Sequence, residues 1–104
     1  MVLSVSKQSV HPDKLEAHAE WAQKAIPRML AVPGLVELRA YRPAAGTTHI
    51  VVTLEFADLT AWAAYSSDPE ILAIIDESRA LLSRNETEIW GPSPVLPEPI
   101  RPGG

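Results

Sequence analysis

The order of strand-like and helix-like periodicities constrains the fold of this chain more than any other feature. Residues 2–6 alternate apolar and small polar side chains, as a half-buried strand does. Residues 35–41 and 49–56 show the same two-residue period, and residues 85–90 form a fourth segment of this kind. The sequence therefore predicts four short strands, the second and third of which form a hairpin around Pro43 to Gly46.

Helical spacing between the first two strands predicts a long amphipathic helix. It is expected to start at Asp13 and to end at Pro33-Gly34. Pro27 lies late in this stretch, and because proline has no backbone donor we expect a kink or a break into two segments there. The predicted core-facing stripe consists of Leu15, Ala19, Ala22, Ile26, Met29 and Leu30.

Two further helix starts lie between the third and fourth strands. Asp58 is expected to cap a short helix, and Asp68-Pro69-Glu70 combines a capping side chain with proline at the first helical position. The residues predicted to be buried by the second of these helices are Ile71, Leu72, Ile75 and Leu82.

The resulting βαββαβ order predicts an α+β, ferredoxin-like fold with an antiparallel sheet and helices on one face. The other face would mix polar side chains with Tyr41, Val51 and Trp90. Such a face needs a cover, so we expect two copies to pair into a dimeric α/β barrel with a ligand cavity.

The chain is expected to contain one domain, residues 1–91, followed by a proline-rich arm, residues 92–104. Repeated prolines exclude a helix or a central strand in the arm. Its aliphatic residues, Val95, Leu96 and Ile100, favour an extended segment lying against the partner over a solvated tail.

Charge and composition exclude several classes of function. The formal net charge is −4 and the pI is near 5.2, which argues against nucleic acid as a partner. Cysteine is absent, so no disulfide, thiolate metal site or cysteine nucleophile can form. The first seven residues are not typical of a signal peptide, and no segment is apolar enough to span a membrane. We expect a cytoplasmic protein without a membrane partner.

Five segments of the chain resemble the dimeric α/β barrel superfamily, which includes the antibiotic biosynthesis monooxygenase-like, stress-responsive A/B barrel and NIPSNAP-like proteins. They are Pro33 to Leu38, Val51 to Phe56, Asp58 to Trp62, Ser67 to Glu70 and Glu88 to Pro92. The resemblance covers most of residues 2–92 and implies the fold more specifically than the activity.

Members of that superfamily include cofactor-independent oxygenases of aromatic polyketides, haem-degrading oxygenases, decarboxylating or dehydrating enzymes, and proteins without established activity. Several relatives have a histidine about three residues after the tryptophan equivalent to Trp62, where this chain has Tyr65. Asn85 also does not match the asparagine of the haem-degrading group, because it lies just before the last strand. A histidine-based mechanism of the haem type is therefore not transferred.

Three side chains are candidates for catalysis. His18, one helical turn from Trp21, could point into a pocket between helix and sheet and act as a general base or as a ligand of metal or haem. A half-buried histidine bonded to the backbone is the structural alternative. His49 opens a strand on the predicted cavity side, and Arg39 could stabilise an anion.

The predicted ligand-binding residues are Trp21, Tyr41, Glu55, Trp62 and Tyr65. Three of them are aromatic residues on helices that could form a wall for a flat ligand, or could belong to the core or an interface. Glu37, Arg39, Tyr41, His49, Thr53 and Glu55 form a polar face that could orient a phenol, enol or carboxylate. Alternatively they form an ion-pair network between two sheets.

Metal-binding spacings, phosphate-binding loops, a dinucleotide fingerprint and a nucleophile elbow are absent from the sequence. We therefore expect no cofactor. Whether the protein is an enzyme is left open: the leading hypothesis is a cofactor-independent monooxygenase acting on an aromatic or polyketide-like small molecule. The alternatives are a non-enzymatic stress-related or ligand-binding dimer and, third, a haem-binding or haem-degrading protein.

Overall fold

The structure is a computed structural model that describes residues 1–103. Its elements follow the order β1 (Val2–Val10), the 3₁₀ helix η1 (Pro12–Lys14), α1 (Leu15–Ala31), β2 (Glu37–Tyr41), β3 (Ile50–Phe56), α2 (Leu59–Ser66), α3 (Pro69–Ser78) and β4 (Leu82–Trp90). The predicted α+β class is confirmed.

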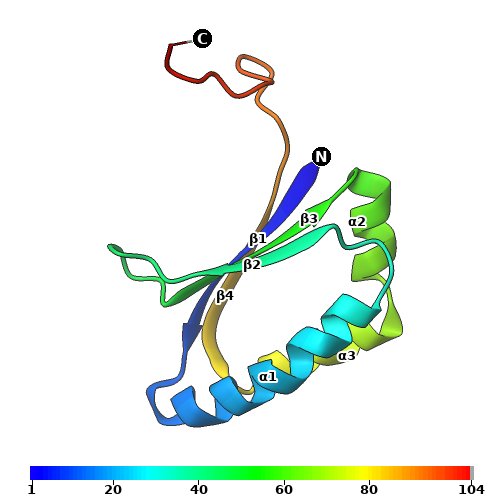
Figure 1. Cartoon of the computed structure of the whole chain (residues 1–104). Helices are drawn as coiled ribbons and strands as arrows, with labels where there is room; N and C mark the ends of the chain where they lie inside the picture. The colour runs from blue at the N-terminus through cyan, green and yellow to red at the C-terminus, as the bar shows by residue number, and fades with distance from the viewer. Residues whose placement is uncertain (104) are drawn as a thin grey trace.

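The four strands form one antiparallel sheet in the order β2-β3-β1-β4. The helices cover one face of this sheet, and the opposite face is bare in the single chain (Figure 1). β1 lies at the centre, where Val5 pairs with Thr53 of β3 and with Glu88 of β4. This is the predicted ferredoxin-like arrangement, and the hairpin of β2 and β3 is confirmed.

Both predicted acidic caps are present. The Asp58 carboxylate accepts a hydrogen bond of 2.8 Å from the Ala61 N–H at the start of α2. The Asp68 carboxylate accepts a hydrogen bond of 2.8 Å from the Glu70 N–H. Proline occupies the first position of α3, directly after Asp68. Each bond satisfies a backbone donor that the first helical turn leaves unpaired.

Several predicted boundaries differ from the structure by two or more residues, and the extent of β1 and the continuity of α1 need explanation. β1 extends to Val10, well beyond the predicted end at Ser6, because the polar residues from Lys7 to Ser9 are held by pairing with β3, β4 or both. α1 is not divided at Pro27 and continues to Ala31. Pro27 forfeits a single bond, the one that its own N–H would have donated to the carbonyl of residue 23, and the helix tolerates this loss.

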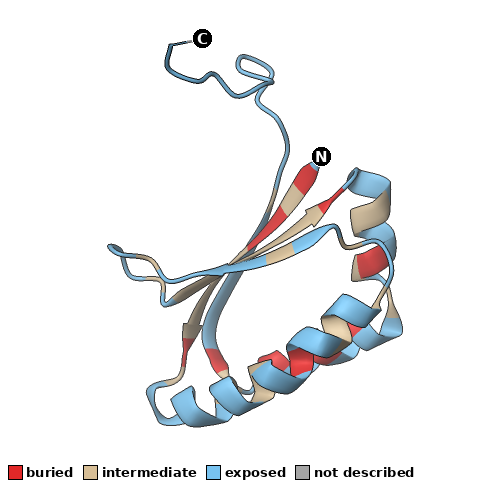
Figure 2. Cartoon of the chain, in the orientation of Figure 1, coloured by how far each residue is buried: buried red, intermediate tan, exposed pale blue. Residues whose placement is uncertain are grey.

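The core lies between the helices and one end of the sheet, and its buried apolar side chains include Val2, Ala25, Phe56, Tyr65, Ile71 and Ile74. The predicted stripe of α1 is only partly correct. Leu15 and Leu30 are each 58% exposed, while Ala25 is the only buried residue of the helix. Ala22, Ile26 and Met29 of the predicted stripe do line the cavity on the sheet side, and the helix is rotated so that His18, Trp21 and Ala25 join them. Figure 2 shows how much of α1 remains exposed.

The predicted burial of α3 also needs correction. Ile71 and Ile74 are buried, but Leu72 is 52% exposed and Leu82 begins β4 rather than belonging to the helix. The apolar period does not distinguish the two sides of this helix, because five consecutive residues, 71–75, are apolar or small.

Residues 91–103 follow β4 without helix or strand and run away from the sheet (Figure 1). Val95 is 91% exposed. The contact of this arm with a partner stays a prediction. Within residues 1–103, no helix has the length and apolar character needed to cross a membrane.

Candidate functional site

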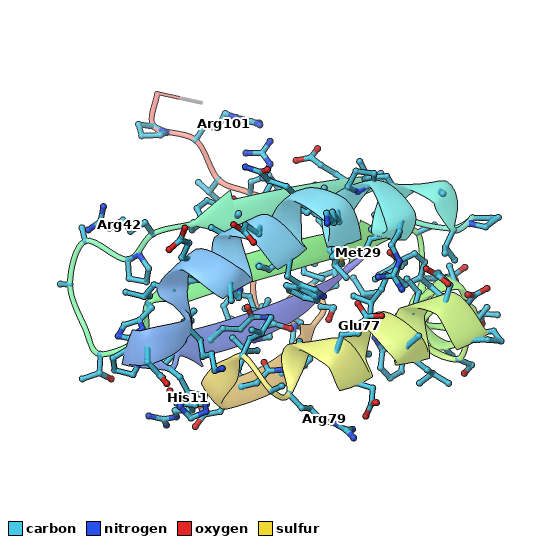
Figure 3. The ribbon with its side chains drawn as sticks, turned by 90° about the horizontal axis from the view of Figure 1, so that it is seen from below. His11, Met29, Arg42, Glu77, Arg79 and Arg101 are labelled. Atoms are coloured by element: carbon cyan, nitrogen blue, oxygen red, sulfur yellow. The ribbon has the colours of Figure 1, made fainter. Side chains whose placement is uncertain are left out.

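A cavity of about 470 Å³ lies between the helices and the covered face of the sheet. We call it the helix–sheet cavity. Side chains of all four strands and of α1, α2 and α3 contribute to its wall. Figure 3 views the molecule from the helix side and shows side chains of α1 and α3, among them Met29 and Glu77, approaching one another beneath the sheet. The volume is in the range of cavities that bind small organic ligands.

One end of the helix–sheet cavity is apolar and aromatic. The rings of Phe56 and Tyr65 pack with their centroids 5.1 Å apart, and Trp62 of α2 lies beside them. The Tyr65 hydroxyl donates a hydrogen bond of 2.8 Å to the Met29 carbonyl oxygen. Burial, with a smaller contribution from Asp68, raises the pKa of Tyr65 to about 12. Tyr65 is therefore a neutral phenol that fixes α1 against α2.

The wall formed by β1 and β4 is polar. Because alternate side chains of a strand point to the same face, both strands direct small polar residues toward the helices. These residues are Ser4, Ser6 and Gln8 of β1 with Asn85 and Thr87 of β4. Ser6 and Thr87 hydrogen-bond to each other through their hydroxyls at 3.1 Å.

Among residues 1–103, His18 is the only histidine that lines this cavity. It is half-buried on α1, and its ring centroid lies 5.7 Å from that of Trp21. Burial lowers the pKa of His18 below its ordinary value of 6.5. At neutral pH its imidazole is therefore uncharged, which is the form that accepts a proton.

Trp21 is held in place by an ion-pair network between α1 and α3. Its indole N–H donates a hydrogen bond of 3.0 Å to the Glu77 carboxylate, and the Arg28 guanidinium makes two more to this carboxylate, at 2.8 and 3.0 Å. Arg28 also pairs with Glu70. The hydrogen bonds from Arg28, followed by the bond from Trp21, lower the pKa of Glu77 to about 2.

We expect Glu77→Gln to lower the stability of the protein at pH 7 and to remove part of its acid sensitivity. The depressed pKa means that ionised Glu77 stabilises the folded state above pH 4.5, and that this contribution is lost as the pH falls toward 2. Urea unfolding at pH 7 and at pH 2–3 measures the effect. Wild type and variant should differ at pH 7 and converge at the acid end.

Asp76→Asn provides the matched control, because Asp76 lies on the same helix and pairs only with Arg79, at 3.3 Å. It should leave the urea midpoint close to that of the wild type. Equal effects of the two substitutions would show that Glu77 does not link α1 to α3.

The structure brings together four of the eight residues predicted for the site. They are His18, Trp21, Trp62 and Tyr65, all of which line the helix–sheet cavity. The functional roles of these residues remain predictions.

The other predicted residues do not reach this cavity. Arg39, Tyr41 and Glu55 lie on the bare face of the sheet, where Arg39 pairs with Glu37 of the same strand. The predicted ion-pair network between two sheets stays a prediction. His49 lies just before β3, and its Nδ1 accepts a hydrogen bond of 3.2 Å from the Val10 N–H. The sheet therefore separates Arg39 from His18, so these two residues cannot act on one ligand within a single chain.

The polar wall is the part of the cavity that sequence reasoning did not find. A signal was present, because Ser4 and Ser6 alternate with Leu3 and Val5 in the first strand. What the sequence did not show is that β4 lies beside β1 and adds Thr87 to the same face. Among residues 1–103, no three histidine or acidic side chains are placed to hold a metal ion.

The bare face combines apolar and charged side chains in a broad hollow of about 580 Å³, and we call it the open face. Apolar residues such as Leu3, Val5 and Val51 lie beside Trp90. Glu88 accepts a hydrogen bond of 2.8 Å from the Trp90 indole and pairs with Lys7 at 3.4 Å. The hydrogen bond from Trp90 makes the largest contribution and the charge of Lys7 the next, and together they lower the pKa of Glu88.

The fold is that of a ferredoxin-like α+β domain, with a cavity between its helices and its sheet. Residues 1–77 match the family model for antibiotic biosynthesis monooxygenase, and the chain belongs to this family. None of the curated protein sequences matches the chain significantly.

Solved structures from several bacteria share the fold. A dabb family protein with a ferredoxin-like fold from Mesorhizobium loti is 17% identical with a TM-score of 0.78, and the match covers 88% of this chain and 96% of that one. A Nitrosomonas europaea protein named after the monooxygenase family is 21% identical with a TM-score of 0.72, and the match covers 88% of this chain and 97% of that one. A Deinococcus radiodurans protein named after the same family is 15% identical with a TM-score of 0.77, covering both chains completely.

Proposed function

We propose that this protein is a cofactor-independent oxygenase that acts on a flat aromatic molecule in the helix–sheet cavity. The observation that carries the proposal is the position of His18, an uncharged imidazole in the wall of a cavity that also contains Trp21, Trp62 and Tyr65. Membership of the antibiotic biosynthesis monooxygenase family supports this class of reaction.

The reaction would begin with proton transfer from the ligand to His18. A polycyclic ketone with an acidic CH₂ group loses a proton from that carbon to the imidazole and becomes an enolate. The enolate reduces dioxygen by one electron, and recombination of the two radicals forms a carbon–oxygen bond. The protonated hydroperoxide then loses water and leaves a second ketone. One ligand and one dioxygen give one diketone and one water, so no external reductant is required.

The remaining residues of the cavity would hold the ligand and stabilise charge. Trp21, Trp62 and Tyr65 supply flat apolar surfaces that orient the rings and exclude water. Hydroxyl and amide donors of the polar wall, including Ser6 and Thr87, would stabilise the developing enolate oxygen. The imidazolium formed at His18 provides the balancing positive charge.

Anthrone, a three-ring ketone with an acidic CH₂ group, tests this proposal. We expect the protein to accelerate dioxygen uptake above the spontaneous rate, with one anthraquinone formed for each dioxygen consumed. Labelled dioxygen should place one labelled oxygen atom in the new carbonyl group. A rate equal to that of buffer, with anthrone bound in the cavity, would contradict the oxygenase and leave a binding protein.

We also propose that the protein acts as a homodimer through the open face. This face is left bare by the helices, although Val51 and Leu3 lie on it and Trp90 and Tyr41 are about half exposed there. Pairing of two such sheets would remove these side chains from water. The exposed aliphatic residues of the arm would then contact the partner. We further propose that this dimer is cytoplasmic and that neither nucleic acid nor a membrane is its partner.

A further inference from the structure

The helix–sheet cavity differs sharply between its two sides. Along β2 and β3 the side chains that face the helices are all apolar, and they include Leu38, Val52 and Leu54. Along β1 and β4 they are polar at five positions, which include Ser4, Gln8 and Asn85. A ligand that fills the cavity therefore meets hydrocarbon along one edge and hydrogen-bonding groups along the other.

Several side chains of the polar wall are free to bond to a ligand. Ser4, Gln8 and Asn85 make no side-chain hydrogen bond within residues 1–103, while no fully buried side-chain N or O atom of this part of the chain lacks a partner. The polar atoms of these three side chains are therefore accessible from the cavity or from solvent, where water can bond to them. A ligand that displaces this water loses affinity unless it reproduces those hydrogen bonds, which favours oxygen substituents along this edge.

The same cavity contains no charged side chain that could balance the charge of a ligand, as far as residues 1–103 are concerned. Among the described residues that line it, none is Asp, Glu, Lys or Arg, and His18 is uncharged because burial lowers its pKa. A carboxylate or phosphate that entered would lose its hydration without gaining a counter-ion, which is strongly unfavourable. Arg28, the nearest cation of the α1–α3 network, is already paired with Glu70 and Glu77.

We infer that the cavity selects uncharged, flat ligands that carry hydroxyl or carbonyl oxygens along one edge, and that it binds this edge against β1 and β4. The opposite, hydrocarbon edge packs on β2 and β3. This inference concerns the ligand of the proposed oxygenase site, and it rests on that proposal only for the choice of cavity. It assigns Ser4, Ser6 and Thr87 as residues that determine ligand orientation.

Three probes of similar size test the selection: 2-acetylnaphthalene, 2-naphthoate and naphthalene. The acetyl compound and the naphthoate differ mainly in charge, and naphthalene lacks the oxygen. Binding is followed through the indole N–H signals in two-dimensional ¹⁵N NMR, assigned with Trp→Phe variants. The signals of Trp21 and Trp62, which line the cavity, should shift on titration, and that of Trp90 on the open face should not.

We expect 2-acetylnaphthalene to bind at least about tenfold more tightly than 2-naphthoate, because only the naphthoate carries an uncompensated charge. It should also bind about 2- to 10-fold more tightly than naphthalene, the range for one neutral hydrogen bond. Equal affinities of the acetyl compound and the naphthoate would overturn the inference, as would shifts confined to Trp90. Absence of binding by all three probes would overturn it as well.

Variants then locate the polar edge. The double substitution Ser6→Ala and Thr87→Val removes both hydroxyls with little change in volume, and it should lower the affinity for 2-acetylnaphthalene to that for naphthalene. Ser4→Ala provides a second, smaller change if the double variant does not fold. Thr53→Val, on the open face, is the matched control and should leave all affinities unchanged.

An equal loss of affinity for 2-acetylnaphthalene and naphthalene in the double variant would show that the hydroxyls do not hydrogen-bond to the acetyl oxygen. This result would overturn the assignment. These measurements involve no dioxygen chemistry. Selective binding without anthrone turnover would therefore support the inference while contradicting the proposed oxygenase.

Discussion

Replacement of His18 by alanine is expected to slow anthrone oxygenation by about 10²- to 10⁴-fold, which is the typical contribution of a positioned general base. His18 is the only histidine that lines the helix–sheet cavity within residues 1–103. Its loss would leave proton removal from the ligand to water. The measurement is kcat from dioxygen uptake, with ligand affinity determined separately so that a binding defect is not taken for a catalytic one.

The pH dependence gives a second test of the same residue. Because burial lowers the pKa of His18 below 6.5, the wild-type rate should be constant near neutral pH and should fall only at pH values below that ordinary value. The His18→Ala variant should lose this acidic limb, and added imidazole should restore part of the rate. His11→Ala, in the turn after β1, is the control and should behave like wild type. Full activity of His18→Ala would exclude it as the base.

Replacement of Leu3 by glutamate is expected to convert the proposed dimer into a monomer. Leu3 lies on the open face, where its cross-strand neighbours are Glu55 of β3 and Trp90 of β4. In a two-fold symmetric dimer the substitution buries two charges, each beside an existing carboxylate. Each uncompensated buried charge costs about 3–5 kcal/mol, so the two together should raise the dissociation constant by about 10⁴- to 10⁷-fold.

Native mass spectrometry and analytical ultracentrifugation measure this change in assembly. Leu72→Glu adds the same charge to the outer side of α3, where Leu72 is already exposed, and it should leave the dimer intact. Circular dichroism would show whether the Leu3→Glu monomer keeps its fold. A dimer that survives Leu3→Glu, or a monomeric wild type, would exclude the open face as the interface.

The sequence predicted those parts of the fold that depend on local chemistry. The caps at Asp58 and Asp68 were found because each carboxylate bonds to a backbone N–H two or three residues away. The two-sided alternation of β3 predicted which of its residues face the helices. The full length of β1 was missed, because its polar second half is stabilised by strands that are distant in sequence.

The candidate site was predicted only in part for the same reason. His18 and Trp21 were identified from helical spacing, which is local. The expectation that they work with Arg39 required knowing on which side of the sheet each residue lies. The structure places Arg39 on the face opposite the helices, since it alternates with Leu38, which lines the cavity. The rotation of α1 was hidden because this helix has apolar residues on two sides, Leu15 and Leu30 on one and Trp21 and Ala25 on the other.

The small buried surface of α1 has a consequence for how the protein would respond to a ligand bound in the helix–sheet cavity. A 17-residue helix with one buried side chain leaves the centre of the domain incompletely packed. A molecule in the cavity would act as a missing part of the hydrophobic core, so occupancy and folding become thermodynamically linked. At a concentration 100 times its dissociation constant, a ligand that binds only the folded state adds about 2.7 kcal/mol to the free energy of unfolding. The lifetime of the protein in the cell would then increase with the concentration of such a ligand.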